Sequence, residues 1–217
     1  MDAKQEILQR IRAALDLSQT APAPKIPRAY RQKGEFPPGS AEVIAEMKGK
    51  LEDYHAQVLE TDSAHLLSTI STALDGVSTL VVPHGLDPQW IQAAQESGAK
   101  IRIDNPSSGH VLSHMELDAT DAVLTASRCA VALTGTIMLD GQPDQGRRAI
   151  TLVPDKHVIV LRAADIYAVV PEAVAVLSQH PERPTTWIAG PSATSDIELR
   201  RVDGVHGPRH LTVIIVK

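Results

Sequence analysis

The chain has 217 residues, of which 43% are hydrophobic but only 3% aromatic, and its formal net charge is −5. This length suits one substantial α/β domain with an appendage. Net negative charge and scarce aromatic rings exclude non-specific nucleic-acid binding, and no apolar run reaches the length of a membrane span. The single cysteine, Cys129, cannot by itself hold an iron–sulfur cluster. We therefore expect a cytoplasmic protein that carries no cofactor of its own.

Metal and nucleotide sites are not predicted either. The nine histidines lack the spacing of a zinc site, so we expect no bound metal. No Gly-x-Gly-x-x-Gly motif follows a strand, and no phosphate-binding Gly-Lys-Ser/Thr loop is present, which gives no support for dinucleotide or ATP binding. Cys129 lies in the apolar run 129–133, which is typical of a buried, unreactive thiol.

The N-terminal part of the chain predicts an appendage. Four apolar residues recur at helical spacing within residues 2–16, namely Ile7, Leu8, Ile11 and Leu15. The segment from Ser18 to Ser40 is rich in proline and carries a basic cluster, which indicates a linker or arm that contacts either solvent or a partner. We therefore divide the chain into residues 1–40, a helix and proline-rich arm, and residues 41–217, an α/β domain.

Helices and strands alternate from about residue 40. We expect helices at about 40–59, 63–74 and 88–97, and strands at 79–83, 100–103 and 122–125. Strand–helix–strand order at this spacing predicts right-handed crossovers. The fold class is therefore α/β, with an open, mainly parallel, Rossmann-like sheet.

An antiparallel hairpin is predicted as an insertion in this sheet. Strand-like segments at 129–133 and 136–139 flank a kink at Thr134–Gly135. A turn at 140–146 then leads into a third strand-like segment at 149–153. The remaining expected elements are a strand at 157–161, a helix at 164–179, a strand at 185–189 and a terminal strand that begins at His210.

Two glycine–proline corners near the C-terminus are the most informative local feature. Gly190–Pro191 ends an apolar strand, and Gly204–Arg209 leads into the terminal strand. Between them, Ser195–Glu198 has the pattern of a capping box at the start of a short helix. Glycine lets backbone N–H groups approach a ligand, and a helix start offers unpaired donors to an anion. Helix capping and ligand binding both remain open here, because a capped helix can still present free donors.

Four motifs carry a resemblance to a known family: 134–139, the strand that begins at His157, 190–198 and 204–208. In this order they resemble the signature blocks of the LUD-domain family, closely over about residues 120–217 and more loosely elsewhere. The resemblance implies a fold similar to that of the sugar-phosphate isomerases and CoA transferases. It also implies a component of L-lactate utilization, in which L-lactate is oxidised to pyruvate together with iron–sulfur-cluster partner subunits. Whether this component is itself an enzyme stays open; the alternative is a stand-alone isomerase or acyl/CoA transferase for a small anionic substrate.

One residue departs from the family pattern. Leu133 stands where the family commonly has an acidic residue before Thr-Gly-Thr. If that carboxylate served as a nucleophile, as a glutamate does in CoA transferases, this chain has lost it, which weakens a covalent mechanism. The remaining catalytic candidates are His206, Asp196 and Glu198. His206 stands in a glycine-rich turn and is free to titrate, which suits proton transfer; the alternative is a turn histidine bonded to the backbone.

A small carboxylate such as lactate or pyruvate needs cationic or N–H donors. Arg147 and Arg148 are either a bidentate clamp over such a ligand or part of a solvated hairpin tip. Thr134 and Thr136 are either ordinary strand residues or ligand contacts. The full set of predicted ligand-binding residues is Thr134, Gly135, Thr136, Arg147, Arg148, Gly190, Pro191, Ser192, Thr194, Ser195, Gly207 and Arg209.

Overall fold

The structure is a computed structural model, which describes residues 2–18, 25–194, 202–203 and 206–217. The chain separates into two units, Met1–Arg31 and Gln32–Lys217. The first unit contains α1 (Ala3–Leu17), which begins after the N-cap residue Asp2. No residue of α1 is buried, and the apolar residues that recur at helical spacing are exposed. The predicted N-terminal amphipathic helix is therefore confirmed.

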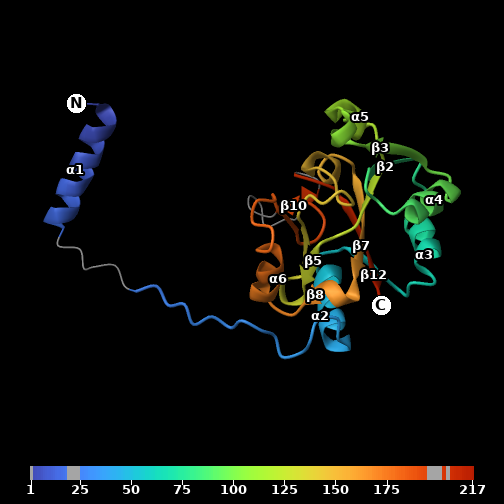
Figure 1. The fold of residues 1–217 in the computed structure, drawn as a ribbon, viewed down its shortest axis with the longest axis horizontal. Helices are drawn as coiled ribbons and strands as arrows, with labels where there is room; N and C mark the ends of the chain where they lie inside the picture. The colour runs from blue at the N-terminus through green and yellow to red at the C-terminus, as the bar shows by residue number, and fades with distance from the viewer. Residues whose placement is uncertain (1, 19–24, 195–201, 204–205) are drawn as a thin grey trace. The chain divides into compact units, whose positions relative to one another are not determined.

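The second unit is built on a six-stranded sheet in the order β1-β12-β7-β4-β2-β3, and all its neighbouring strands are parallel (Figure 1). The strands are β1 (Gln57–Thr61), β2 (Thr79–Pro83), β3 (Lys100–Asp104), β4 (Ala122–Thr125), β7 (Lys156–Arg162) and β12 (His210–Val216). The four central strands are almost entirely buried, as their continuous apolar runs indicate. The predicted open, parallel α/β sheet is confirmed.

Helices cover both faces of this sheet. On one face lie α3 (Leu66–Ala73) and α4 (Pro88–Glu96), which pack against buried side chains of β2, β4 and β7. On the other face lies α2 (Ala41–Asp53), whose buried apolar residues pack against β7 and β12. A short helix, α5 (His114–Asp118), begins with a capping box between Ser113 and Glu116.

A second, four-stranded sheet lies on the α2 side in the order β8-β5-β6-β9. Its strands are β5 (Cys129–Val131), β6 (Thr136–Leu139), β8 (Ile166–Tyr167) and β9 (Thr186–Ile188), and α6 (Val170–Leu177) packs against it. The β5–β6 pair is antiparallel about Thr134–Gly135, so this part of the predicted hairpin insertion is confirmed. It turns at Gly135, whose φ of +60° favours glycine and where a Cβ atom would lie 2.8 Å from the Cβ atom of Lys50.

The predicted helix at 40–59 was wrong beyond residue 53. The helix ends at Asp53, where His55 adopts a φ of +65° and the Ala56 N–H donates to the Leu51 carbonyl. The chain then enters β1, which pairs with β12 at the edge of the sheet. A residue in the left-handed backbone conformation, His55, therefore follows the end of the helix.

Two further predictions were wrong. The expected strand at 149–153 is instead a 3₁₀ turn, η3 (Arg148–Thr151), whose Ile150 packs against Val81 and Val123 of the sheet. The expected helix at 164–179 begins only at Val170, because residues 166–167 pair with β5 as strand β8 and Pro171 stands in the first helical turn. Both errors come from long-range packing that overrides a local apolar pattern.

Cys129 lies fully buried in β5, as predicted. Burial raises the pKa of its thiol to about 12, so the thiolate is not formed near neutral pH. Within the described ranges no three or more potential metal-ligating His, Cys, Asp or Glu side chains come together. The helices of these ranges are all too short or too polar to span a membrane.

Candidate functional site

The two glycine–proline corners lie against each other beside the first residues of β7 and β12. The Ser192 N–H donates to the Pro208 carbonyl at 2.8 Å, and the His206 N–H donates to Ser192 Oγ at 2.9 Å. Gly190 has a φ of +78°, and a Cβ atom there would lie 2.6 Å from the Cβ atom of Tyr54. Two segments that the sequence singled out separately therefore form one wall.

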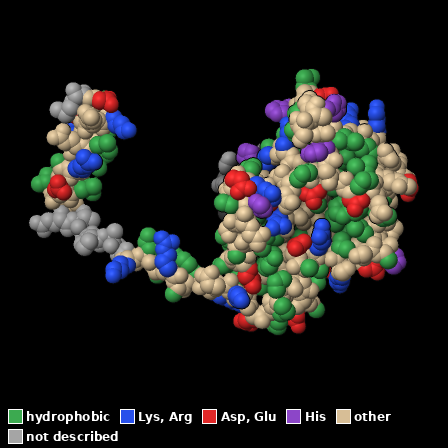
Figure 2. Space-filling view, in the orientation of Figure 1, with side chains coloured by type: hydrophobic (Ala, Val, Ile, Leu, Met, Phe, Trp, Pro, Cys, Tyr) green, Lys and Arg blue, Asp and Glu red, His purple; other side chains and the backbone are tan. Residues whose placement is uncertain are grey.

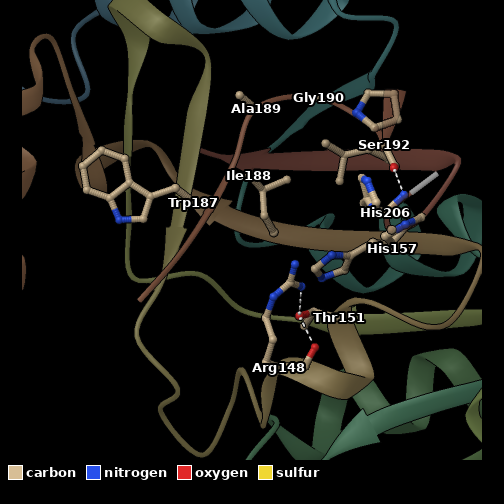
Figure 3. A pocket seen from close by; sticks show the side chains of 13 residues that line it. Arg148, Thr151, His157, Trp187, Ile188, Ala189, Gly190, Ser192 and His206 are labelled. Atoms are coloured by element: carbon tan, nitrogen blue, oxygen red, sulfur yellow. Dashed lines mark hydrogen bonds between the residues drawn. The ribbon is translucent and has the colours of Figure 1, made fainter. Parts of the chain in front are cut away.

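This wall borders an open cavity of about 220 Å³. Figure 3 shows Arg148 rising from η3 toward His157, with Ser192 and His206 across the cavity from Arg148 and Trp187 off to one side. The cavity is lined by Arg148, Thr151, His157, Trp187, Ile188, Ala189, Gly190, Pro191, Ser192, His206, Gly207, Pro208 and Leu211. Six of the predicted site residues thus lie together: Arg148, Gly190, Pro191, Ser192, His206 and Gly207.

Arg148 provides the positive charge of this cavity. Its Nη1 donates to Thr151 Oγ1 at 3.2 Å, and Thr151 Oγ1 donates to the Arg148 carbonyl at 3.1 Å. None of the ion pairs that the described residues form includes Arg148. Its guanidinium is therefore oriented by a hydroxyl but not neutralised by a carboxylate within that part of the chain, which suits an anionic ligand.

His157 is the site residue that the sequence did not reveal. It is 1% exposed at the start of β7, and its Nε2 lies 2.9 Å from Thr125 Oγ1. Burial, and secondly the charge of Arg148, lower the pKa of His157 to about 3. The imidazole is therefore neutral near pH 7 and acts as a hydrogen-bonding group, not a second cation. The available signal was a histidine at the head of an otherwise apolar strand.

Arg147 has a different environment from its neighbour. Its Nε and Nη2 donate to the two carboxylate oxygens of Asp104, both at 2.9 Å, and Nη2 also donates to the Leu112 carbonyl. Asp104 is 1% exposed and also accepts from the Leu112 N–H. Arg147 thus stabilises the loops that follow β3. Within the part of the chain that the structure describes, Arg147 has a carboxylate partner and Arg148 has none. A direct contact of Arg147 with a ligand stays a prediction.

A larger cavity of about 440 Å³ adjoins the first one, and both are lined by Arg148 and Thr151. It lies at the carboxyl ends of β2 and β3, next to the place where the strand order reverses between β2 and β4. Open α/β sheets usually bind ligands at such a place. Its lining consists of His84, Pro106, Ser107, Leu139, Gly141, Gln142, Pro143, Gly146, Arg147, Arg148, Thr151, Pro184 and Thr186.

The predicted residues at 134–136, between β5 and β6, line neither cavity. Thr134 Oγ1 and Thr136 Oγ1 are hydrogen bonded to each other at 2.8 Å beside Gly135. Leu133 is 49% exposed on the same turn, and its N–H donates to the Ala168 carbonyl. Leu133 is therefore not a neighbour of Arg148, and a ligand contact of Thr134, Gly135 or Thr136 stays a prediction.

Two of the other predicted residues, Arg209 and Thr194, are described by the structure, and the rest are not. Arg209 forms an ion pair with Asp155 and lines neither cavity. Thr194 pairs with Val202 between the short strands β10 (Ala193–Thr194) and β11 (Val202–Asp203). Ser195, Asp196 and Glu198, with the capping box that they were expected to form, lie outside the described residues.

Comparison with known proteins identifies the family. The sequence profile of the LUD domain matches residues 44–216. The chain belongs to the LUD-domain family. A protein named lactate utilization protein C from Deinococcus radiodurans is 40% identical, and the match covers 99% of this chain and 96% of that protein. A protein of the same name from Bacillus subtilis is 25% identical over 81% of this chain and 78% of its own length.

A solved structure supports the same assignment. The crystal structure of a DUF162 family protein from Deinococcus radiodurans superimposes with a TM-score of 0.66 and 34% sequence identity. The match covers 82% of this chain and 98% of the other. All residues that line the two cavities lie between positions 44 and 216, so both cavities belong to the LUD domain itself.

Proposed function

We propose that this LUD-domain chain is a component of L-lactate utilization and binds a small carboxylate, lactate or pyruvate, at Arg148. The process is supported by the relatives named lactate utilization protein C, of which one is 40% identical over nearly the whole chain. The ligand class is supported by the cavity. Both point to the same chemistry, because lactate and pyruvate are monocarboxylates.

The guanidinium of Arg148, which forms no ion pair with the described residues, is the observation that carries the ligand assignment. A guanidinium presents two parallel N–H donors that match the two oxygens of a carboxylate. Because His157 stays neutral, it adds no second positive charge to that of Arg148. Ser192 and His206 lie across the cavity, within the same lining, where the 2-hydroxyl or 2-oxo group of the ligand would be placed. His206, whose side chain is exposed, is the proposed proton-transfer residue.

The oxidation itself is assigned to partner subunits. Conversion of lactate to pyruvate releases two electrons and two protons, and the electrons require a redox group. The single cysteine of this chain is buried and its thiol pKa is raised to about 12, which disfavours the thiolate that binds an iron–sulfur cluster. We therefore propose that this chain works in the cytoplasm with separate iron–sulfur-cluster subunits.

Growth on L-lactate tests the process and the site together. The gene is deleted in the native host and restored as the wild-type chain, as Arg148→Gln or as the control Arg162→Gln. Arg162 is exposed at the other end of β7 and lines neither cavity. We expect growth on L-lactate as sole carbon source with the wild type and the control, but not with Arg148→Gln at equal protein level. Growth of the deletion strain itself would contradict the role in lactate utilization.

Purification of the tagged chain from lactate-grown cells tests the partner assignment. We expect subunits that contain iron and acid-labile sulfide to be retained with the chain. Isomerase or CoA-transferase turnover by the isolated chain, with no iron–sulfur subunit retained, would instead favour the stand-alone enzyme.

A further inference from the structure

The larger cavity leaves room for more than a three-carbon acid. Arg148 lines both cavities, so a carboxylate bound to its guanidinium lies at their boundary. The smaller cavity, of about 220 Å³, would hold the carboxylate and hydroxyl end of such a ligand. The larger one, of about 440 Å³, has the size of a site for a substantial organic group, since ligand pockets usually measure roughly 300–1,000 Å³.

The walls of the larger cavity are mainly apolar and held in place. Its apolar lining residues are Pro106, Leu139, Pro143 and Pro184. The Gly85 N–H donates to the Pro143 carbonyl at 3.0 Å, and the Ala126 N–H donates to the Asp144 carbonyl at 3.1 Å. These bonds fasten the 140–146 loop to the ends of β2 and β4. The cavity is therefore formed before a ligand enters.

The charge in this cavity decides which group fits. Arg147 is part of its lining, but both carboxylate oxygens of Asp104 accept from its guanidinium. A second anionic group, such as the distal carboxylate of a diacid or a phosphate ester, would have to compete with this buried carboxylate. A neutral, apolar group gains by leaving water and disturbs no ion pair.

We infer that the site binds 2-hydroxy acids with a large apolar side chain in preference to lactate, with the carboxylate on Arg148 and the side chain between Pro106, Leu139 and Pro184. This inference rests on the proposed carboxylate site at Arg148 and names its substrate class. Burial of a phenyl-sized group predicts a gain of about tenfold or more in affinity.

Calorimetric titration of the full chain with L-lactate and with L-3-phenyllactate tests this inference, because the two acids share one head group. We expect L-3-phenyllactate to bind about tenfold or more tightly than L-lactate. Ser107→Trp places a large ring at the larger cavity from an exposed position and should bring the ratio of the two affinities close to one. Ser108→Trp, in the same turn but outside the lining of either cavity, should keep the wild-type ratio. Thermal unfolding of both variants verifies that they are folded.

The outcomes separate this inference from the proposed function. L-lactate binding that Arg148→Gln abolishes, with no gain for L-3-phenyllactate, would overturn the inference and leave the carboxylate site standing. A gain that Ser107→Trp does not reduce would also overturn it, because the phenyl group would then lie elsewhere. Binding of neither acid would overturn the carboxylate site and the inference with it.

Discussion

Arg147 and Arg148 are adjacent in the sequence, yet they belong to two regions with opposite electrostatic character. The charge of Arg147 is neutralised, because its guanidinium donates to the buried Asp104 carboxylate and to the Leu112 carbonyl. The charge of Arg148 is not neutralised by any described carboxylate, since its guanidinium contacts a hydroxyl and the neutral His157 lies beside it. The first arrangement holds loops together, whereas the second leaves a cation to be matched by a ligand.

This difference shows that two neighbouring arginines can have separate roles, one in the stability of the fold and the other in ligand binding. A buried carboxylate that loses its partner is strongly unfavourable, so the Asp104 region should respond to mutation through the free energy of unfolding. An exposed cation without a partner contributes little to folding, so the Arg148 region should respond through ligand affinity.

The largest expected effect is that of Arg147→Gln on stability. The substitution leaves Asp104, which is 1% exposed, without its charged partner. We expect the free energy of unfolding to fall by about 3 kcal/mol, as measured by urea denaturation. Asp104→Asn combined with Arg147→Gln should recover part of this loss, because the double variant buries no unpaired charge. A loss below about 1 kcal/mol for the single variant would show that the two regions do not differ as described.

The second prediction concerns acid and His157. The pKa of His157 is about 3 in the folded chain and 6.5 as its ordinary value, so below pH 6.5 the unfolded chain binds a proton that the folded chain excludes. Its contribution is fully present above pH 6.5 and declines as the pH falls, by up to about 1.4 kcal/mol per pH unit. Between pH 7 and pH 5 the wild type should lose about 2 kcal/mol more than His157→Gln, measured by urea denaturation at each pH. Equal losses of stability in the two proteins would mean that His157 is also protonated in the folded chain at pH 5.

The third prediction tests whether the larger cavity has a fixed wall. In Gly85→Ala the new Cβ atom would lie 2.4 Å from Pro143 Cβ and 2.6 Å from Pro143 C, so the 140–146 loop must shift. We expect a loss of about 1.5 kcal/mol. Gly49→Ala is the matched control, because it stands within α2 and its Cβ atom meets nothing within 4 Å; it should stabilise the chain by up to about 1 kcal/mol. An unchanged stability of Gly85→Ala would mean that the loop moves freely.

Sequence patterns predicted the buried strands well but missed one of the two edge strands, β1. Strands such as Thr79–Pro83 are short, continuous apolar runs, and such runs are typical of strands buried inside a parallel sheet. The edge strand β1 has only two apolar residues, Val58 and Leu59, and its only strand partner among the described residues, β12, follows about 150 residues later. Nothing near Gln57–Thr61 reveals that pairing, so the predicted helix at 40–59 extends into this strand.

The candidate site divides in the same way. The glycine–proline corners were found because glycine and proline restrict the backbone locally, wherever the chain goes next. The difference between Arg147 and Arg148 was not predictable, because it depends on Asp104 at the end of another strand. His157 was read only as part of a strand, since its place beside Arg148 arises when η3 packs against the sheet. Contacts across the fold thus decide which of the polar residues are site residues.

The smallest expected effect on stability is that of Arg148→Gln, and it completes the comparison with Arg147. Arg148 has an exposed side chain with one side-chain hydrogen bond, to Thr151, so the free energy of unfolding should change by no more than about 0.5 kcal/mol. The same variant should lose the rise in melting temperature that saturating L-3-phenyllactate gives the wild type, because a ligand stabilises only the state that binds it. Arg147→Gln should still show a ligand-induced rise from its lower starting temperature. If instead Arg148→Gln unfolded as readily as Arg147→Gln, both arginines would serve the fold, and the cavity would lack the cation on which carboxylate binding depends.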